Sequence, residues 1–458
     1  MARAVQGEPE RGGPQTPGDG RRAPLGHVVV LGAGIAGLLA ARVLADHAER
    51  VTVLERDLLD DTAARPRPGV PQGHHAHGLL ARGALIIEDM FPGFRSEVTG
   101  LGANGFDFGE GMCLVHRTGI APMVGTGIFS MSFTRPFLER EIRDRVRRLP
   151  QVRILDGWHA DGFRSRSGRV TGVTSRSPGD TVAADLVVVA TGRHAHLADW
   201  LEKAGYPRPR ERVIDAQVGY TTRFYEGSDP AVAGWIGLVE APQPPDLPRG
   251  CFAGHVENGL LQVTLVGAAG NHPPHDETAF DAFARSLRGP LYQTLDRSQP
   301  LAGVRRYART ANRRLACHRT PRWPAGLIAM GDAVCSFNPI YGQGMTLAAL
   351  QAVLLGELLT DSARHQNMDM LPRTFQRRLA RLSSWPWLLA TLPDSQWEEG
   401  TTPGPATRIA QRYQTRWTNH IPQDAELHTR FARIMNMLDG PTALLRPAII
   451  NAALRGTP

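Results

Sequence analysis

The sequence predicts an α/β protein with a parallel sheet, an inserted antiparallel β-sheet and a helical C-terminal region. Three observations predict this fold. Residues 27–54 have the pattern strand, helix, strand, and further apolar runs that suit buried parallel strands follow at 185–190 and 327–330. Strand-like runs at about 218–266 suit an antiparallel sheet, and residues from 360 onwards have a mainly helical pattern.

The parallel region is predicted element by element. Residues 27–31 form a continuous apolar run, 35–46 have helical periodicity, and 51–54 form a second apolar run. Prolines make 65–73 a loop, because proline removes a backbone donor and fixes φ. The other expected elements are an amphipathic segment at 77–90, turns and short strands at 106–133, a helix at 135–149, several strands at 152–190, a strand at 327–330 and a helix at about 344–359.

The composition is that of an ordinary folded enzyme. A chain of 458 residues exceeds the size of a single compact core, so two or three subdomains are expected. The formal charge of +8 comes largely from arginines along the whole length, whereas nucleic-acid binders concentrate basic residues in a patch. We therefore expect no nucleic-acid partner. A solvated basic surface explains the charge, and attraction of an acidic carrier protein or an anionic cofactor remains open.

Cysteine usage and the N-terminus indicate a cytoplasmic protein. The four cysteines are far apart and form no CxxC pair, so neither a disulfide framework nor a zinc site is indicated. Residues 1–24 are rich in Gly, Pro and Arg and lack the apolar core of a secretory signal, so we expect a disordered tail. No run approaches 18 apolar residues, and no membrane span is expected.

A glycine-rich turn follows the first strand and opens the first helix. Its sequence is Gly32-Ala33-Gly34-Ile35-Ala36-Gly37, which lets the backbone approach a pyrophosphate at a helix N-terminus. Glu55 ends the second strand 18 residues after Gly37, and Arg56 follows it. An acid at this place accepts hydrogen bonds from a ribose diol and repels a 2′-phosphate. The pattern favours FAD or NAD.

A second motif lies near the end of the parallel region. Gly331-Asp332 follows a buried strand, and Asn338-Pro-Ile-Tyr-Gly-Gln-Gly-Met345 begins a helix. At these residues the sequence resembles the flavoprotein monooxygenases of the aromatic-hydroxylase and squalene-epoxidase superfamily, over about 28–359. The resemblance implies a Rossmann-type FAD-binding domain. Its implied FAD contacts are Gly32, Gly34, Ala36 and Gly37 for the pyrophosphate, Glu55 and Arg56 for the adenosine ribose, Asp332 for the ribityl chain, and Gly342, Gly344 and Met345 beside the flavin ring.

The same resemblance divides the chain into four regions. A disordered tail at 1–24 precedes a discontinuous FAD-binding domain. The expected limits are 25–105, 135–215 and 301–360 for the FAD-binding domain, 106–134 and 216–300 for the substrate domain, and 361–458 for the helical C-terminal region.

Two further stretches narrow the resemblance. The first is Arg67-Pro-Gly-Val-Pro-Gln72, which leads into His75-Ala-His77, and the second is Phe337-Asn-Pro-Ile-Tyr-Gly-Gln-Gly-Met345. Both look like the corresponding stretches of the bacterial polyether epoxidases. Those enzymes epoxidise olefins of linear polyketides such as the monensin and lasalocid precursors. The resemblance implies epoxidation of a small apolar olefin through a flavin C4a-hydroperoxide, in antibiotic biosynthesis. It places Arg135, in Ser132-Phe-Thr-Arg-Pro-Phe-Leu138, against the cofactor. We expect Arg67 to meet the isoalloxazine or its phosphate, and His77 to pack beside the flavin or in the loop.

Several alternatives stay open. His74, His75 and His77 lack partners at metal-ligand spacing, so a metal site is disfavoured. Pro339 and Tyr341 are candidates for residues near the flavin, although Tyr341 suits a core position equally well. We identify no convincing base, which favours an olefin over a phenol.

Other reactions fit the same fold. An aromatic or polyketide hydroxylase is the nearest alternative, and an olefin reductase (saturase) is one of another reaction class. A redox-neutral FAD binder ranks lowest. NAD(P)H is expected to supply electrons, directly or through a flavin reductase, because there is no second nucleotide-binding loop. Whether the substrate is bound to a carrier protein is left open.

Overall fold

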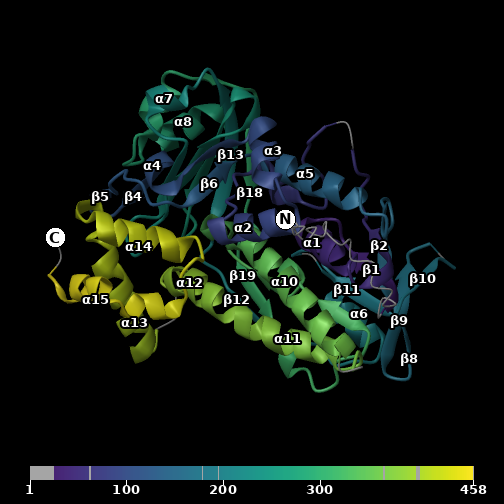
Figure 1. Cartoon of the computed structure of the whole chain (residues 1–458). Coiled ribbons are helices and arrows are strands. Elements are labelled where there is room, and N and C mark those ends of the chain that lie inside the picture. Colours follow the sequence, from purple (N-terminus) through teal and green to yellow (C-terminus); the bar gives the residue numbers. More distant parts are fainter. Residues whose placement is uncertain are drawn as a thin grey trace, which may run out of the picture.

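The computed structural model describes residues 25–60, 63–177, 179–193, 195–364, 367–398 and 403–456. The tail predicted at 1–24 lies outside the described residues. The protein is a mixed α/β fold with one parallel sheet and several antiparallel sheets. In Figure 1 the parallel strands lie at the right, the large antiparallel sheet at the top and the last helices at the left.

The parallel sheet holds the first two predicted strands side by side at its centre. Its strand order is β20-β11-β1-β2-β7. Apolar runs form these strands because both faces of the sheet are covered, and Val28, Val29 and Val30 of β1 are fully buried. The bounds are Leu25–Leu31 (β1), Ala48–Leu54 (β2), Val152–Leu155 (β7), Leu186–Val189 (β11) and Leu327–Ala329 (β20).

Helices cover this sheet. Helix α1 (Ile35–Leu44) packs against α5 (Arg135–Arg147) and α10 (Gln343–Arg364). By length and composition α10 could cross a membrane, yet it also packs against α2 (Ala81–Met90) and α11 (Leu371–Leu382) and most of it is buried. It is therefore placed as a core helix. The shorter neighbours are α3 (Phe94–Gly100) and α6 (Leu197–Lys203).

The large antiparallel sheet lies between β11 and β20 in the sequence, apart from two strands that come earlier. Its order is β17-β13-β16-β15-β14-β4-β5, with β18 also paired to β13, and its pairs are antiparallel except for β14 with β4. Helices α8 and α9 pack their apolar sides on one face, and Phe280 and Leu291 are fully buried there. The bounds are Met112–His116 (β4), Gly119–Ile120 (β5), Gly219–Glu226 (β13), Gly237–Glu240 (β14), Arg249–His255 (β15), Leu261–Gly267 (β16), Gln299–Pro300 (β17), Arg305–Tyr307 (β18), Glu277–Arg285 (α8) and Leu291–Leu295 (α9).

Strand β18 lies beyond residue 300, the limit predicted for the substrate domain. It pairs Tyr307 with Tyr220 of β13 and so extends the antiparallel sheet. Three residues are too few for a periodic pattern, which is why local sequence does not reveal this strand.

Smaller sheets connect the two main ones. They have the orders β10-β9-β8, β12-β19-β21 and β3-β6. The bounds are Asn104–Asp107 (β3), Phe129–Ser132 (β6), Ala160–Arg166 (β8), Arg169–Ser175 (β9), Thr181–Ala183 (β10), Glu211–Ile214 (β12), Asn312–Leu315 (β19) and Cys335–Ser336 (β21). The short helices are Phe108–Gly111 (α4), Pro230–Ala233 (α7), Pro71–His74 (η1), Glu257–Gly259 (η2), Cys317–Arg319 (η3), Gly331–Ala333 (η4) and Pro339–Tyr341 (η5).

The C-terminal region is helical, as the sequence predicts. Trp417, Ile421, Leu427 and Ile449 form its apolar core and pack against Leu114 of β4. This contact attaches the last helices to the antiparallel sheet. The bounds are Ser384–Asp394 (α12), Pro405–Thr418 (α13), Ala425–Met435 (α14), Pro447–Leu454 (α15), Ile421–Gln423 (η6) and Pro441–Leu445 (η7).

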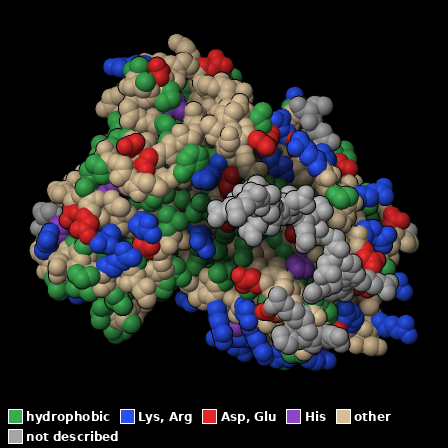
Figure 2. All heavy atoms as spheres, in the orientation of Figure 1, with side chains coloured by type: hydrophobic (Ala, Val, Ile, Leu, Met, Phe, Trp, Pro, Cys, Tyr) green, Lys and Arg blue, Asp and Glu red, His purple; other side chains and the backbone are tan. Residues whose placement is uncertain are grey.

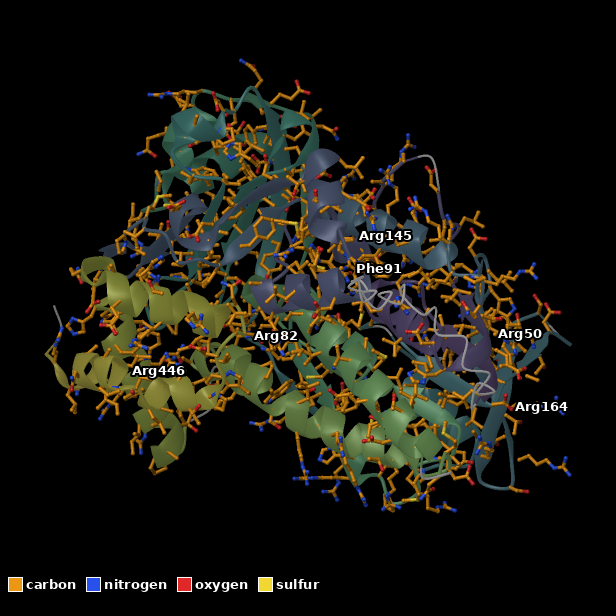
Figure 3. All side chains as sticks on the ribbon, in the orientation of Figure 1. Arg50, Arg82, Phe91, Arg145, Arg164 and Arg446 are labelled. Carbon is orange, nitrogen blue, oxygen red and sulfur yellow. The ribbon has the colours of Figure 1, made fainter. Side chains whose placement is uncertain are left out.

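Basic side chains are spread over the protein. Figure 3 shows the labelled arginines Arg50, Arg82, Arg145, Arg164 and Arg446 projecting from different elements. This spread agrees with the scattered arginines of the sequence.

Candidate active site

The glycine turn between β1 and α1 opens into a cavity of about 470 Å³. Gly34 caps α1, and a side chain added there would meet only Arg67 Nη2, at 3.8 Å from its Cβ. Gly37 faces the other way, since its Cβ would lie 1.8 Å from the Gly32 carbonyl oxygen. Gly34 therefore leaves space in the cavity, whereas Gly37 lets the helix pack on the strand.

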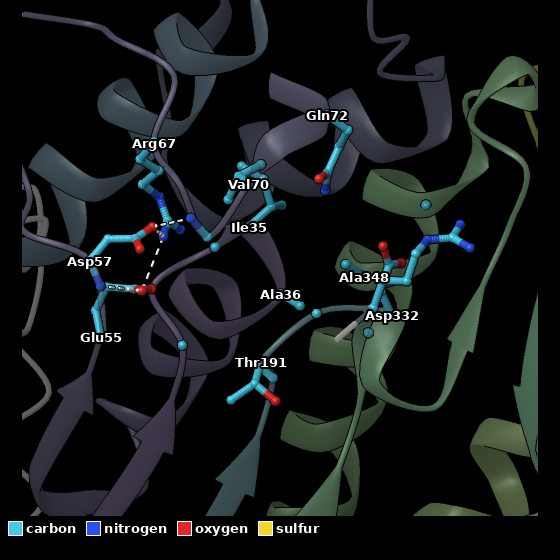
Figure 4. A pocket seen from close by; sticks show the side chains of 18 of the residues that line it. Ile35, Ala36, Glu55, Asp57, Arg67, Val70, Gln72, Thr191, Asp332 and Ala348 are labelled. Atoms are coloured by element: carbon cyan, nitrogen blue, oxygen red, sulfur yellow. Dashed lines mark hydrogen bonds and ion pairs between the residues drawn. The ribbon is translucent and has the colours of Figure 1, made fainter. Parts of the chain in front are cut away.

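At one end of this cavity, a buried cation lies among three carboxylates (Figure 4). Glu55 accepts hydrogen bonds from the Ala33 amide at 2.7 Å and the Asp57 amide at 3.0 Å. Arg67 Nη1 lies 3.1 Å from Glu55 Oε1 and 2.8 Å from Asp57 Oδ2. Arg67 Nε donates to Glu139 Oε1 at 2.7 Å. Arg67 is thus held at the Glu55 end with Nη2 directed to the glycine turn.

Helix α5 brings its first residue to the same cavity. Arg135 is 8% exposed, and its Nη2 donates to Glu139 Oε2 at 2.8 Å. Among the described residues, the buried Arg135 Nε has no hydrogen-bond partner. His77 Nδ1 bonds the His75 carbonyl oxygen at 2.9 Å. Burial and then the Arg135 charge lower the pKa of His77 to about 4, so its ring is neutral at pH 7.

The opposite wall of the cavity comes from the late motif. Asp332 in η4 lies on the opposite side of the view from Glu55 in Figure 4, and the preceding Gly331 packs against Ala36. Its Oδ1 is 3.7 Å from where a Cβ would stand on Gly344, at the start of α10. Burial raises the pKa of Asp332, against the opposing charges of Arg193 and Arg135. Asp332 is therefore the acceptor on this wall.

A second cavity, of about 300 Å³, adjoins the first. The two share lining residues His77, Gly78, Asn338 and Gly342. Most of its other walls are apolar and come from the large sheet and the C-terminal helices. In Figure 2 hydrophobic side chains gather in the hollow between the upper part of the molecule and these helices. The arrangement is a polar cavity that continues into an apolar one.

The structure places the predicted residues as follows. The residues that line the first cavity are Gly32, Gly34, Ala36, Glu55, Arg56, Arg67, His77, Arg135, Asp332, Pro339, Gly342, Gly344 and Met345. Gly37 lies behind the turn, and Tyr341 lines the second cavity instead of the first. His75 lines neither cavity, because its ring packs on the large sheet, where Nδ1 forms a hydrogen bond with Thr222 Oγ1 at 2.7 Å. Their roles toward a cofactor stay predictions.

Two residues of the site received no role from the sequence. Arg193 lines the first cavity and donates to the carbonyl oxygens of Ala311 and Phe337. Asp185 and Thr191-Gly192-Arg193 resemble the middle strand and turn of the flavoprotein monooxygenases, but this resemblance alone assigned Arg193 no contact.

Asp394, the last residue of α12, lines the second cavity, for which the sequence indicates no convincing base. Its carboxylate accepts hydrogen bonds from Tyr341 Oη and Asn312 Nδ2, both at 2.6 Å. Burial raises the pKa of Asp394 to about 6, against the hydrogen bonds that lower it. No local signal marks Asp394, because packing of α12 alone brings it here.

Solved structures define the class of fold. The flavin-dependent brominase Bmp2 superposes with a TM-score of 0.65 at 14% identity, covering 93% of this chain and 98% of that one. PqsL from Pseudomonas aeruginosa, a probable FAD-dependent monooxygenase, superposes with a TM-score of 0.56 at 16% identity, covering 81% and 97%. The fold is that of flavin-dependent monooxygenases and halogenases.

Sequence comparison identifies relatives. Protein Rv3254 of Mycobacterium tuberculosis is 34% identical over 395 residues, which are 82% of each chain. The chain belongs to the same family as Rv3254. The 6-methylpretetramide 4-monooxygenase of Streptomyces rimosus is 25% identical over 380 residues, covering 78% of this chain and 80% of that one. No family model matches the chain.

Proposed function

We propose that this chain is an FAD-dependent monooxygenase that inserts one oxygen atom of O2 into an apolar, polyketide-like substrate, with epoxidation of an olefin as its reaction. The observation that carries the proposal is the pair of joined cavities. A nucleotide-type cavity with a glycine turn meets an apolar cavity at His77, Gly78, Asn338 and Gly342. A cofactor in the first cavity can therefore meet a substrate in the second.

The residues of the first cavity fit FAD. Gly34 leaves space before the N-terminus of α1, where backbone N–H groups and Arg67 Nη2 favour a pyrophosphate. Glu55 is available to a ribose diol, and Asp332 on the far wall to the ribityl hydroxyls. The buried, unpartnered Arg135 Nε supplies a donor. These contacts are the proposed cofactor site.

The protein's part in the reaction is to position the substrate and keep water out. FAD, when bound and reduced, supplies the activation of O2. The apolar walls of the second cavity bind an olefin by burying its surface and exclude water from the reacting groups. The neutral His77 at the junction offers a hydrogen bond without bringing a charge. NAD(P)H, acting directly or through a reductase, is the proposed electron source.

Hydroxylation of a phenolic or enolic polyketide is the second candidate. Asp394 favours it, because a carboxylate in the wall of a mainly apolar cavity is a group that takes a proton from a substrate hydroxyl. The Streptomyces rimosus relative is named as a 4-monooxygenase of 6-methylpretetramide, and this name supports the second candidate.

Isotope labelling tests the proposal. Protein loaded with FAD is reduced chemically and mixed with ¹⁸O2 in the presence of farnesyl acetate or 1-naphthol, and the products are weighed by mass spectrometry. An epoxide of farnesyl acetate that carries one ¹⁸O atom supports epoxidation, whereas a labelled hydroxynaphthol supports the second candidate. A product that gains two hydrogens without ¹⁸O, or no labelled product from either probe, would overturn oxygen insertion. The Gly34→Val variant is the cofactor-free control.

A further inference from the structure

Tyr341 and Asp394 form a short hydrogen-bonded pair in the wall of the apolar cavity. Tyr341 Oη donates to Asp394 Oδ1 at 2.6 Å, and both residues line the second cavity. Tyr341 comes from the turn before α10, while Asp394 ends α12, so 53 residues separate them. Tertiary packing has brought a carboxylate to a turn that lies between the two cavities.

The hydrogen bonds of Asp394 determine which of its two oxygens can receive a proton. Its Oδ2 is occupied by two amide donors, Asn312 Nδ2 at 2.6 Å and Asn338 Nδ2 at 3.1 Å. Its Oδ1 accepts from Tyr341. Because the Tyr341 proton is committed to Asp394, the lone pairs of the tyrosine oxygen remain as acceptors. Tyr341 therefore offers an acceptor, and no donor, to a ligand in the cavity.

We infer that Tyr341 and Asp394 are a proton-accepting pair for a hydroxyl group of the substrate, which makes the substrate a hydroxylated apolar molecule. The inference rests on the proposed function in taking the second cavity as the substrate cavity. A substrate hydroxyl donates to Tyr341 Oη. When the proton moves, the substrate O–H bond breaks, a new Oη–H bond forms, and the original tyrosine proton passes to Asp394 Oδ1. The electron pair stays on the substrate oxygen, and no redox change occurs in this step.

The protonation state of Asp394 controls the direction of this relay. Burial raises its pKa to about 6, so the carboxylate is ionised at pH 7.5 and protonated at pH 5. Once protonated, Asp394 becomes a donor to Tyr341, whose own proton then turns to the cavity. Burial holds the pKa of Tyr341 well above its usual value, so the tyrosine relays a proton without ionising itself.

Other titratable groups near the pair do not account for a change near pH 6. Tyr220 faces Asp394 through Asn338, and burial raises its pKa as well. Asp215 acts on Asp394 through its charge. Across the cavity, burial lowers the pKa of both His77 and His116 to about 4. The remaining charged group in the wall is Arg117, which pairs with Asp246.

The Asp394→Asn substitution reverses the direction of the hydrogen bond to Tyr341 with little change in the shape of the side chain. In Asp394→Asn, the amide oxygen can keep the donors of Asn312 and Asn338, while its NH2 group donates to Tyr341 Oη. Tyr341 then offers a donor to the cavity. Tyr341→Phe removes the hydroxyl and leaves Asp394 its two amide donors. Tyr413→Phe is the matched control, because its hydroxyl bonds the Leu444 carbonyl oxygen outside both cavities.

Binding of a matched pair of probes tests the inference. Dissociation constants of the FAD-loaded protein for 1-naphthol and 1-methoxynaphthalene are measured by calorimetry from pH 5 to pH 8. The ether can accept a hydrogen bond but cannot donate one. We expect the wild type and Tyr413→Phe to prefer naphthol roughly tenfold at pH 7.5, and to lose this preference as the pH falls through about 6. Asp394→Asn shows none at any pH. Tyr341→Phe presents Asp394 Oδ1 directly to the ligand, so it keeps a preference that is also lost as the pH falls.

Three outcomes would overturn the inference. The first is that the wild type does not bind naphthol or shows no preference for it. The second is a wild-type preference that does not change with pH, and the third is retention of the preference in Asp394→Asn. FAD content and melting temperature report whether each variant is folded, and the pH dependence of the wild type carries the test if Asp394→Asn does not fold. Failure of the proposed function appears separately, as absence of ¹⁸O-labelled product, because this binding measurement needs no oxygen.

Discussion

Arg67 Nε donates to Glu139 Oε1 at 2.7 Å, which ties the proline-rich loop to helix α5 across 72 residues of sequence. The same guanidinium contacts Glu55 and Asp57, and the three carboxylate side chains are only 5–6% exposed. Three buried anions therefore share the Arg67 cation at the proposed adenosine end of the cavity, and Glu139 also pairs with Arg135.

Arg67→Met is expected to destabilise the protein strongly. Removing the shared cation leaves Glu55, Asp57 and Glu139 buried without it, which costs about 3–5 kcal/mol of unfolding free energy. Urea unfolding of the cofactor-free protein measures the loss. The control is Arg208→Met, whose surface pair with Asp199 is about half exposed, so this variant should unfold at nearly the urea concentration of the wild type. Equal losses in the two variants would contradict the arrangement.

Gly34→Val and Gly37→Ala are expected to fail in different ways. At Gly34 the new side chain enters the open cavity, so the melting temperature stays near that of the wild type while FAD is no longer retained. At Gly37 even a methyl group meets the Gly32 carbonyl oxygen, so the fold loses at least about 3 kcal/mol. Thermal unfolding and flavin absorbance per protein separate the two effects. Normal flavin content in Gly34→Val would refute the assignment of this turn.

Asp332→Asn is expected to weaken FAD binding roughly tenfold or more, because an amide is a weaker acceptor for cofactor hydroxyls than a carboxylate. The free energy of unfolding should not fall. The pKa of Asp332 is raised by burial, so its charged form destabilises the cofactor-free protein as the pH rises above the unfolded value, and the neutral amide removes that term. Fluorescence titration with FAD and urea unfolding at pH 7 measure both effects. Unchanged FAD affinity would remove Asp332 from the proposed site.

His75→Gln is expected to reduce the sensitivity of the protein to acid. Burial, assisted by the charges of His77 and His74, lowers the pKa of His75 to about 3, whereas the unfolded chain binds a proton near pH 6.5. Its contribution to stability is therefore complete above pH 6.5 and is lost as the pH falls towards 3, at roughly 1.4 kcal/mol per unit. Urea unfolding at pH 7, 6 and 5 gives the slope.

The slope for His75→Gln should be shallower than for the wild type. If His75→Gln keeps the wild-type slope, the ring is not held neutral in the sheet.

Local pattern predicted the parallel sheet and one half of the cavity well. The strands β1 and β2, helix α1 and Gly32, Gly34 and Glu55 lie within about 30 consecutive residues, so periodicity and turn chemistry are sufficient to place them. The late motif with Asp332 was likewise visible, because it joins a buried strand to a helix start. The olefin as substrate was argued from a missing base, and Asp394 removes that argument.

The sequence by itself determined the strand–glycine turn–helix unit, the late Asp332 motif and the helical C-terminal region, because each depends on residues close together in the chain. Only the tertiary structure decided that Arg67 is shared by Glu55, Asp57 and Glu139, that Tyr341 faces the second cavity, and that Asp394 joins it there. These contacts join segments tens of residues apart. They depend on how buried charges and polar groups find partners when whole elements pack, and no local periodicity records that.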